Sequence, residues 1–493
     1  MSKWVHTEIE NEEVLERTIA LCRERKVIIP TFEQLAHPEL IPEKIKKQLA
    51  NIGLWDIHPL NLFRVSWHND LKTGLYGGVN YLRIPSELSG VRCPIFILIG
   101  KCFPTGCHKV GATFGPLVSR LVTGRFDPTT QKALWPSTGN YCRGGAFNSR
   151  LLGCKAIAVL PENMSQERFN WLRETGAEVF ATPGCESNVK EIFDKAHELV
   201  NDNPGVVINF NQFEELTNPL FHYHCTGPAM EEVYEQNKTA KSRFAGICLN
   251  QGSAGSLACG MYLHTKFPKM LVGCSEALQC PTLLRNGFGD HRIEGIGDKH
   301  VPFVLNAKDQ DVILGIDDEA AMRVFRLFNT PEGHEVLLKA GVAKEVVDQL
   351  NLLGISGCAN LLGCIKMAKH YEYTENDFLF TLATDSAEMY QTRLTELDQQ
   401  LGKYTEVYAY GEFFRYLLGQ EDNNLEELTY ESRKRIHNLK YYTWVEQQGK
   451  SIEELNAQWY DDEYWPIMME AAHRYDELIK QFNERTGLLN EEE

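Results

Sequence analysis

A lysine that follows a proline–glycine turn is the first residue whose type and setting could do chemistry. Lys109 lies in the segment PTGCHKVGA at 104–112, just after the apolar run IFILIG, and we expect it at the start of a helix. An isolated lysine is most often a solvated surface charge. A lysine placed against a cofactor and out of water can instead form a Schiff base, because desolvation lowers its pKa. This segment alone leaves both alternatives open.

Three further loops combine glycine with hydroxyl or amide side chains. The loop PSTGNYCRGGA at 136–146 is rich in backbone N–H groups, which suit a carboxylate. The loop NQGSAGSL at 250–257 precedes a predicted helix, whose N–H groups and dipole favour a small phosphate. It lacks both the P-loop lysine and the spacing G-x-G-x-x-G. The loop LLGISGCAN at 352–360 carries another hydroxyl, and each loop alone could be a plain turn.

A regular scaffold must position these loops, and the central part of the chain has the pattern of one. Between about residues 90 and 370, short apolar runs alternate with helical segments such as SQERFNWLRETG and VKEIFDKAHELV. This alternation is typical of a doubly wound α/β fold with a mainly parallel sheet, in which ligands bind where strands end. The predicted strands are CPIFILIG, KAIAVLP, AEVFAT, GVVINF, AGICLN and MLVGCS.

Helices are predicted at both ends of the chain. Near the N-terminus, Leu15, Ile19 and Cys22 recur at helical spacing, and Thr31 is placed to cap a second helix. A last helix is predicted to stop at Gly487. Its apolar face comprises Met468, Ala472, Tyr475, Ile479 and Phe482. The aromatic residues nearby predict packing on the body of the protein or on a second subunit, with a ligand cage as the alternative.

Composition and charge narrow the class of protein. The 493 residues carry 50 Lys and Arg against 67 Asp and Glu, a net charge of −17, which argues against binding to nucleic acid or to an anionic membrane. No apolar run is long enough to span a bilayer, and the acidic N-terminus is no signal peptide. The 14 cysteines include no C-x-x-C pair, so we predict no metal site and a cytoplasmic protein.

Taken together, the four loops and the segments between them resemble one enzyme family. From about residue 58 to 395 the chain is similar to the pyridoxal-phosphate enzymes of fold type II, in the branch of cysteine synthase and cystathionine β-synthase. The order and spacing of the loops agree with that family. The most specific stretches are LPENMSQERFNWLRETGAEV, NFNQFEELTNPLFHYHCTGPAMEEV, HRIEGIGDKHVP and TLATDSAEMYQT.

The resemblance implies a set of residues that bind pyridoxal 5′-phosphate. Lys109 matches the lysine that holds the cofactor as a Schiff base, and Asn140 matches the asparagine that hydrogen-bonds its phenolic oxygen. Ser356 matches the residue that faces the pyridine nitrogen. The phosphate-binding loop corresponds to Gly252, Ser253, Ala254, Gly255 and Ser256.

The resemblance also implies a set of residues that bind the substrate. The loop that closes on the substrate carboxylate corresponds to Ser137, Thr138 and Gly139, and Gln212 matches a glutamine that assists it. The loop at Gly295 and Ile296 matches the segment that lines the substrate side of the site.

Three positions depart from the family pattern. Val110 follows the lysine where Asp or Arg is usual, and Ala254 stands where glycine is common. Tyr141 stands where a small hydroxyl residue is expected. Its ring either narrows the substrate pocket and supplies a donor to a longer substrate, or turns away and packs beneath the helical extension. These changes spare cofactor binding and put the natural substrate in doubt.

The residue facing the pyridine nitrogen bears on the type of reaction. Because a serine cannot hold a charged pyridinium, the cofactor is a weaker electron sink, which favours β-elimination over transamination. Lys109 is the natural base for the Cα proton. We therefore predict β-elimination or β-replacement on a cysteine- or serine-like amino acid through an aminoacrylate. The alternatives are a threonine- or serine-dehydratase-like ammonia-lyase and a weakly catalytic cofactor-binding subunit of a complex.

The resemblance also sets an expected domain organisation. We expect a helical N-terminal extension at 1–57 and a catalytic core at 58–385 with two α/β lobes, the smaller at about 110–205. A helical C-terminal extension is expected at 386–493. A homodimer is expected as well, from the resemblance and from the apolar, aromatic helical ends. Cys107 and Cys142 near the site are either redox-sensitive thiols or simply buried.

Overall fold

Two β-sheets organise residues 4–490, the part of the chain that the computed structural model describes. The strands are β1 (Tyr81–Ile84), β2 (Ile95–Ile99), β3 (Lys132–Pro136), β4 (Lys155–Pro161), β5 (Glu178–Thr182), β6 (Val207–Asn209), β7 (Arg243–Asn250), β8 (Leu271–Ala277), β9 (Val312–Ile316), β10 (Asp377–Ala383) and β11 (Leu425–Glu427). The larger sheet has the order β1-β2-β10-β7-β8-β9-β11 and the smaller the order β5-β4-β3-β6. Only the edge strands β1 and β11 pair antiparallel, so the mainly parallel α/β fold is confirmed.

All six predicted strands are present, as β2, β4, β5, β6, β7 and β8. Four strands of the core were not predicted, namely β1, β3, β9 and β10. Of these, β10 lies between β2 and β7 in the middle of the larger sheet, although almost 130 residues separate it from β7 in the chain. Its place depends on pairing with distant strands, which a local apolar pattern does not report.

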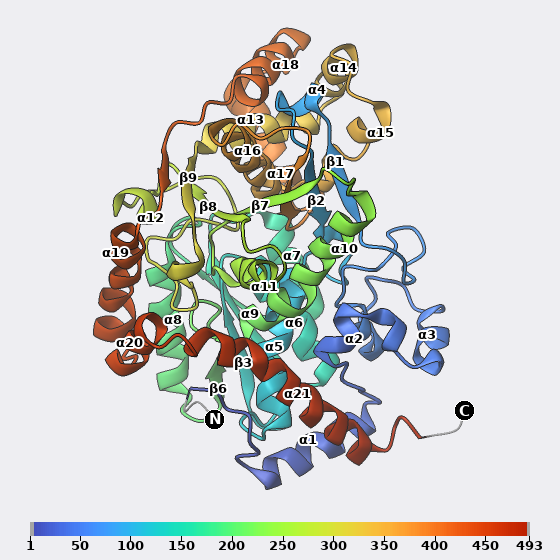
Figure 1. Cartoon of the computed structure of the whole chain (residues 1–493). Helices are drawn as coiled ribbons and strands as arrows, with labels where there is room; N and C mark the ends of the chain where they lie inside the picture. Colours follow the sequence, from blue (N-terminus) through green and yellow to red (C-terminus); the bar gives the residue numbers. More distant parts are fainter. Residues whose placement is uncertain (1–3, 491–493) are drawn as a thin grey trace.

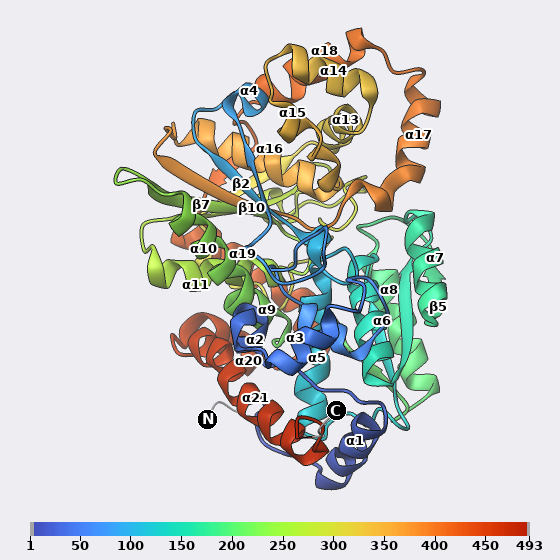
Figure 2. The same ribbon diagram turned by 90° about the vertical axis from the view of Figure 1, so that its right-hand side faces the viewer.

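Helices cover both sheets of the core (Figures 1 and 2). They are α4 (Ser86–Ser89), α5 (Lys109–Val122), α6 (Asn140–Leu152), α7 (Gln166–Thr175), α8 (Val189–Asp202), α9 (Asn218–Phe221), α10 (Gly227–Asn237), α11 (Ala258–Lys266), α12 (Thr282–Arg285), α13 (Asp318–Phe328), α14 (Pro331–Lys339), α15 (Lys344–Val347) and α16 (Ile355–His370). Helix α5 contacts α6 and α9 and joins the two lobes, so its first residue lies between them.

The predicted helical extensions are present at both ends. They contain α1 (Glu12–Glu24), α2 (Phe32–Ala36), α3 (Glu43–Leu49), α17 (Gln391–Leu401), α18 (Glu406–Glu412), α19 (Tyr430–Lys440), α20 (Ile452–Tyr460) and α21 (Tyr464–Thr486). Leu15, Ile19 and Cys22 are buried, and Thr31 caps α2 as predicted. The predicted apolar face of α21 is buried, and the helix ends before Gly487, which has a φ of +77°.

The two extensions bind each other and the core. Figure 2 shows α21 beside α1 at the foot of the molecule. The carboxylate of Asp476 on α21 accepts hydrogen bonds from the backbone N–H groups of Phe32 (2.6 Å) and Glu33 (3.1 Å) at the start of α2. Because α21 also packs on α5, both extensions support the helix that begins at Lys109.

One part of the C-terminal extension differs from the helical prediction. Residues Leu425–Glu427 form β11, which pairs antiparallel with β9 at the edge of the larger sheet. A sheet edge exposes unpaired N–H and C=O groups, and a short strand satisfies them. The segment is too short for its own periodicity to predict a strand. Within residues 4–490, no helix is both long and apolar enough to cross a membrane.

Candidate active site

The amine of Lys109 lies between the two lobes. Lys109 is the first residue of α5, and its Nζ donates to Gln212 Oε1 at 3.2 Å and to Ser253 Oγ at 3.0 Å. Burial lowers the pKa of Lys109, although the charges of Cys107, Asp298 and Glu186 oppose this effect. A lysine with a lowered pKa exposes a neutral amine at lower pH, which is the form that attacks a carbonyl or accepts a proton.

The predicted phosphate loop connects β7 to α11 beside this amine. Ala254 adopts a left-handed backbone with a φ of +65°, the conformation that the glycine common at this position provides without strain. A Cβ at Gly252 would lie 2.8 Å from the carbonyl oxygen of Gly295, and a Cβ at Gly255 would lie 2.6 Å from Asn218. The absence of side chains at these two glycines therefore lets the loop approach the neighbouring backbone closely.

A small pocket gathers most of the predicted cofactor residues. Of the predicted set, Lys109, Gly252, Ser253, Ala254, Ser256, Gly295 and Ile296 line it. Its remaining walls come from six residues that the sequence did not single out: His108, Leu249, Asn250, Asn360, Leu382 and Thr384. His108 directly precedes α5, and the other five lie at the carboxyl ends of β7 and β10 or on α16, so the pocket forms where strands of the larger sheet end.

The predicted carboxylate loop lies next to the pocket and is linked to its lysine. Gln212 Nε2 donates to Ser137 Oγ at 3.0 Å, and the same side chain accepts from Lys109. Asn140 begins α6, and its Nδ2 donates to Asp385 Oδ2 at 2.7 Å. An amide nitrogen has two donors, so one N–H of Asn140 remains available for a ligand. Gly139 has a φ of +143°, and a Cβ there would lie 2.6 Å from Cδ of Arg168.

Ser356 carries a buried hydroxyl without a hydrogen-bond partner in the structure. It lies in the first turn of α16, only 2% exposed, and Asn250 Nδ2 donates to its backbone oxygen at 2.7 Å. Buried hydroxyls in proteins are nearly always satisfied. The free hydroxyl beside a pocket-lining asparagine therefore fits a ligand atom that is bound in the functional state.

Tyr141 packs in the protein core. Its ring meets Trp135 edge-on at 5.5 Å, and the side chain is fully buried. Its hydroxyl has no hydrogen-bond partner, and burial raises the pKa of Tyr141 well above its ordinary value. The residue does not belong to the pocket lining, so its contacts favour the packing alternative over substrate recognition.

We expect Tyr141→Phe to raise the free energy of unfolding by about 1 kcal/mol, because the change removes a buried hydroxyl that lacks a partner. Urea unfolding at constant pH measures this effect. The order of amino-acid substrates by kcat/KM is expected to stay the same in the variant. A reordering would show that the hydroxyl contacts the substrate.

Cys107 and Cys142 are both fully buried. Burial raises the pKa of each thiol to about 12, so neither is a thiolate near neutral pH. Because the thiolate is the reactive form, the structure supports the simple burial of these residues over a redox role.

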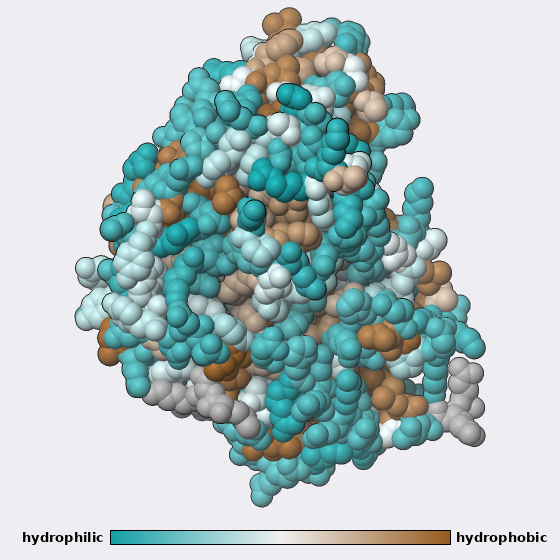
Figure 3. Space-filling view, viewed as in Figure 1, coloured by the Kyte–Doolittle hydropathy of each residue, from teal (hydrophilic) through white to brown (hydrophobic). Residues whose placement is uncertain are grey.

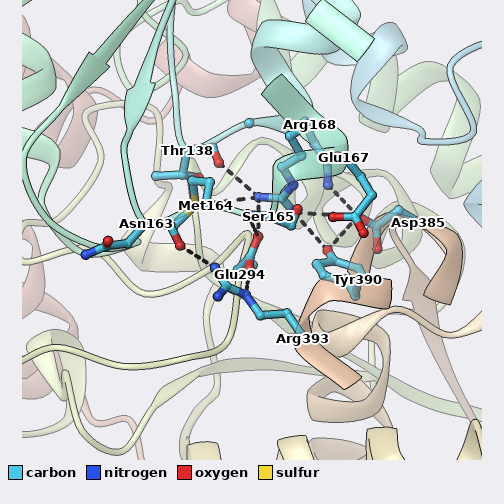
Figure 4. A network of polar contacts seen from close by, with 12 residues as sticks. Thr138, Asn163, Met164, Ser165, Glu167, Arg168, Glu294, Asp385, Tyr390 and Arg393 are labelled. Atoms are coloured by element: carbon cyan, nitrogen blue, oxygen red, sulfur yellow. Dashed lines mark hydrogen bonds and ion pairs between the residues drawn. The ribbon is translucent and has the colours of Figure 1, made fainter. Parts of the chain in front are cut away.

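A buried ionic network that the sequence analysis did not predict connects the two lobes (Figure 4). At its centre, Arg168 on α7 contacts Glu294 Oε2 at 3.0 Å and donates to Tyr390 Oη at 2.8 Å. Tyr390 in turn donates to Asp385 Oδ2 at 2.7 Å, the oxygen that Asn140 also contacts. The sequence signal lay in the family-like stretches MSQER and TLATDSAEMY, which supplied the resemblance but no assigned role.

The network also holds the carboxylate loop directly. Arg168 Nη1 donates to the backbone oxygen of Thr138 at 2.9 Å, and Figure 4 shows this contact beside Glu294 and Arg393. Arg393 Nε donates to Glu294 Oε1 at 2.6 Å. The loop of the smaller lobe is thus tied to residues that follow β10 of the larger sheet.

Comparison with known proteins decides the family. A model described as pyridoxal-phosphate dependent enzyme matches residues 73–359, more than half of the chain. The chain belongs to this family. A cysteine synthase of Staphylococcus aureus is 28% identical over 272 residues, which cover 55% of this chain and 85% of the relative. The cystathionine beta-synthase of Saccharomyces cerevisiae is 26% identical over 329 residues, which cover 65% of this chain and 61% of the relative.

Solved structures confirm the fold of this pyridoxal-phosphate dependent enzyme. The cysteine synthase of Entamoeba histolytica superposes with a TM-score of 0.56 at 19% identity, covering 70% of this chain and 93% of that chain. A hydrogen sulfide-producing enzyme of Fusobacterium nucleatum has a TM-score of 0.53 at 24% identity, covering 63% and 96%. The cofactor fits the residues present, because Lys109 and most of the loop at 252–256 line one pocket, and Asn250 in its wall hydrogen-bonds the backbone of Ser356, whose hydroxyl has no partner.

Proposed function

We propose that this enzyme catalyses β-elimination or β-replacement on a cysteine- or serine-like amino acid. The observation that carries the proposal is the unpartnered hydroxyl of Ser356, whose backbone is hydrogen-bonded to Asn250 in the wall of the pocket that holds Lys109. A serine facing the pyridine nitrogen disfavours a long-lived carbanion and therefore favours departure of a β-substituent. The relatives named cysteine synthase and cystathionine beta-synthase support the same class of reaction.

Each residue of the predicted cofactor site has a proposed role toward one part of the cofactor. Lys109 would hold the cofactor aldehyde, the loop at 252–256 its phosphate, Ser356 its pyridine nitrogen and Asn140 its phenolic oxygen. The bound cofactor supplies the electron sink for charge at Cα. Lys109, whose pKa is lowered by burial, would take the Cα proton at its Nζ.

The proposed substrate-binding roles are based on the hydrogen bonds that connect the carboxylate loop to Lys109. The loop of Ser137, Thr138 and Gly139 would bind the α-carboxylate through its N–H groups. Gln212 would orient both partners, since it hydrogen-bonds Ser137 and Lys109 in the structure. Gly295 and Ile296 line the pocket and would exclude water from the substrate. Tyr141, predicted as a further substrate residue, would act there only by shaping α6 behind the loop.

A cytoplasmic homodimer belongs to the same proposal. Large apolar side chains are exposed on α18 and the turn after it, among them Val407 at 81% and Phe414 at 56%. Figure 3 shows apolar side chains at this upper end of the molecule. Exposed apolar clusters favour association between subunits. Light scattering at micromolar concentration is expected to give twice the mass of the chain, and a monomer mass would contradict the dimer.

A spectroscopic screen tests the proposed reaction. The purified enzyme with pyridoxal phosphate is mixed with L- and D-amino acids, and absorbance changes are recorded together with sulfide, pyruvate and ammonia. We expect β-substituted amino acids such as L-cysteine, L-serine or O-acetyl-L-serine to react. Release of ammonia from threonine alone would instead support a dehydratase-like activity. Cofactor binding without any turnover would support a binding subunit.

A further inference from the structure

A polar cavity lies where both terminal extensions meet the core, and we call it the junction cavity. Its walls come from the start of the N-terminal extension, the last turn of α5 and the residues after it, the segment at 214–217, and the C-terminal extension. Figure 1 shows α20 and α21 close to β6 and α5 at this end of the molecule. Arg120 in the wall and Lys109 in the active site lie on the same helix, about 16 Å apart along its axis. The junction cavity is therefore separate from the site pocket.

The charged side chains in the wall of the junction cavity balance one another. Three are cations and three are carboxylates: Arg120, Arg125, Lys450, Glu214, Glu215 and Glu454. Four of them form two ion pairs, Arg120 with Glu215, and Lys450 Nζ with Glu214 Oε2 at 2.8 Å. Within residues 4–490, the other two, Arg125 and Glu454, have no ion-pair partner in this wall. One cation and one carboxylate therefore remain for a ligand.

Arg125 is held in the wall without a close carboxylate. Its Nε donates to Thr123 Oγ1 at 3.1 Å and lies 3.7 Å from Glu10 Oε1, beyond hydrogen-bond distance. The same oxygen of Glu10 lies 2.8 Å from His6 Nδ1. The Arg125 side chain is only 18% exposed, and burial lowers its pKa. Because a guanidinium carries five N–H donors in a planar fork, this group suits a carboxylate that binds with both oxygens.

Glu454 provides the matching carboxylate. It is 9% exposed, and its Oε1 accepts a hydrogen bond from the hydroxyl of Tyr464 at 3.1 Å. Burial raises the pKa of Glu454, although the charge of Lys450 opposes this effect. A buried carboxylate whose donor is neutral is stabilised by an added cation. An ammonium group in the cavity would supply that cation.

The segment at 214–217 connects the junction cavity to the active site. It starts two residues after Gln212, whose side chain hydrogen-bonds Lys109 and Ser137. At its other end, Asn218 Nδ2 donates to the backbone oxygen of Gln212 at 3.0 Å. The segment is thus a short loop that closes on Gln212. A ligand bound against this loop would fix the position of the Gln212 side chain.

We propose that the junction cavity is a second binding site, for a free amino acid in its zwitterionic form. The ligand carboxylate binds Arg125, and the ligand ammonium group binds Glu454. The carbon chain of the ligand lies against Leu216, Met468 and Ala471. A ligand with one charge only leaves either the cation or the carboxylate of the wall unmatched. Binding changes the KM of the active site through the segment at 214–217, a statement that rests on the proposed function, whereas the binding site itself does not.

Equilibrium dialysis tests the site. The holoenzyme is first treated with borohydride, which fixes the cofactor to Lys109 and prevents an amino acid from replacing that bond. Binding of radiolabelled L-leucine and 6-aminohexanoate is then measured, because their two charges lie close together and far apart, respectively. We expect one of them to bind saturably, with one site per chain. Its analogues without the ammonium or the carboxylate group (4-methylpentanoate and 3-methylbutylamine, or hexanoate and hexylamine) should each bind at least about tenfold more weakly.

Single substitutions assign the two contacts. Arg125→Gln should lower the affinity for the zwitterion at least about tenfold and remove the preference over the amine analogue, and Glu454→Gln should do the same for the carboxylate analogue. Arg150→Gln and Glu463→Gln are matched controls, because both residues are exposed and lie outside the junction cavity. Thermal unfolding identifies the variants that are folded. An absence of saturable binding, a wild type that does not prefer the zwitterion, or unchanged affinity in both cavity variants would overturn the site.

Steady-state kinetics test the effect on the active site. The substrate is the amino acid with the highest turnover in the screen, and the added ligand is the zwitterion identified by dialysis. We expect the ligand to change KM about fivefold or more in the wild type. Arg125→Gln should have the same basal kinetics and should not respond to the ligand. The same change of KM in this variant would overturn the link to the active site. If no amino acid is turned over, the proposed function fails, whereas dialysis still decides the binding site.

Discussion

Lys109→Ala is expected to lower kcat at least about 10³-fold, because the change removes both the covalent attachment of the cofactor and the base for the Cα proton. The fold should persist, because the loop at 252–256 can still hold the cofactor phosphate. Turnover with the best amino acid of the screen measures the first effect. Thermal unfolding measures the second.

Borohydride reduction tests whether the cofactor is bound covalently to Lys109. Borohydride treatment of the wild type should fix the cofactor to the peptide that contains Lys109, whereas the variant should release it on denaturation. Lys101→Ala is a matched control, because Lys101 lies eight residues earlier and pairs with Glu388 outside the site pocket. A Lys109→Ala protein that still retained cofactor after borohydride treatment would assign the attachment to another lysine.

Arg168→Ala is expected to lower the free energy of unfolding by about 3–5 kcal/mol, because it removes the buried cation that lies between two buried carboxylates. Arg168 is fully buried and contacts both Glu294 and Asp385. The variant should also raise KM for the amino acid, since Arg168 holds the backbone of Thr138 in the carboxylate loop. Urea unfolding and steady-state kinetics measure the two effects separately.

A second arginine on α7 provides the control, because its removal shows how much stability is lost when any arginine of this helix is replaced. Arg173 is exposed near the end of α7, so Arg173→Ala should change the free energy of unfolding by less than about 0.5 kcal/mol. An Arg168→Ala protein as stable as Arg173→Ala would show that the network between the lobes contributes little. An unchanged KM would show that the carboxylate loop keeps its position without Arg168.

Several features of this enzyme could be predicted from the sequence because they depend on local patterns. Strands β2, β4, β5, β6, β7 and β8 are short apolar runs between helices, and the burial of both sheet faces requires that pattern. The faces of α1 and α21 follow from helical spacing. The loops stand out by their glycine and hydroxyl residues, the family resemblance implies the cofactor, and the family model confirms the cofactor class.

Other features were decided only by tertiary packing. Strand β10 obtains its place from β2 and β7, and Arg168 meets Asp385 and Glu294 only because the two lobes come together. Tyr141 departs from the family pattern in a way the sequence could interpret as recognition or packing, and its contact with Trp135 favours packing.

The positions of Arg125 and Glu454 are the clearest example. In the sequence they are one cation among 50 basic residues and one carboxylate among 67 acidic residues. In the fold, both line the cavity where the extensions meet the core, and the other four charged residues of its wall pair with each other. Local sequence reports which groups can carry charge, but desolvation and pairing depend on what surrounds them. The charges that this cavity presents, like the lowered pKa of Lys109, are therefore a property of the tertiary structure.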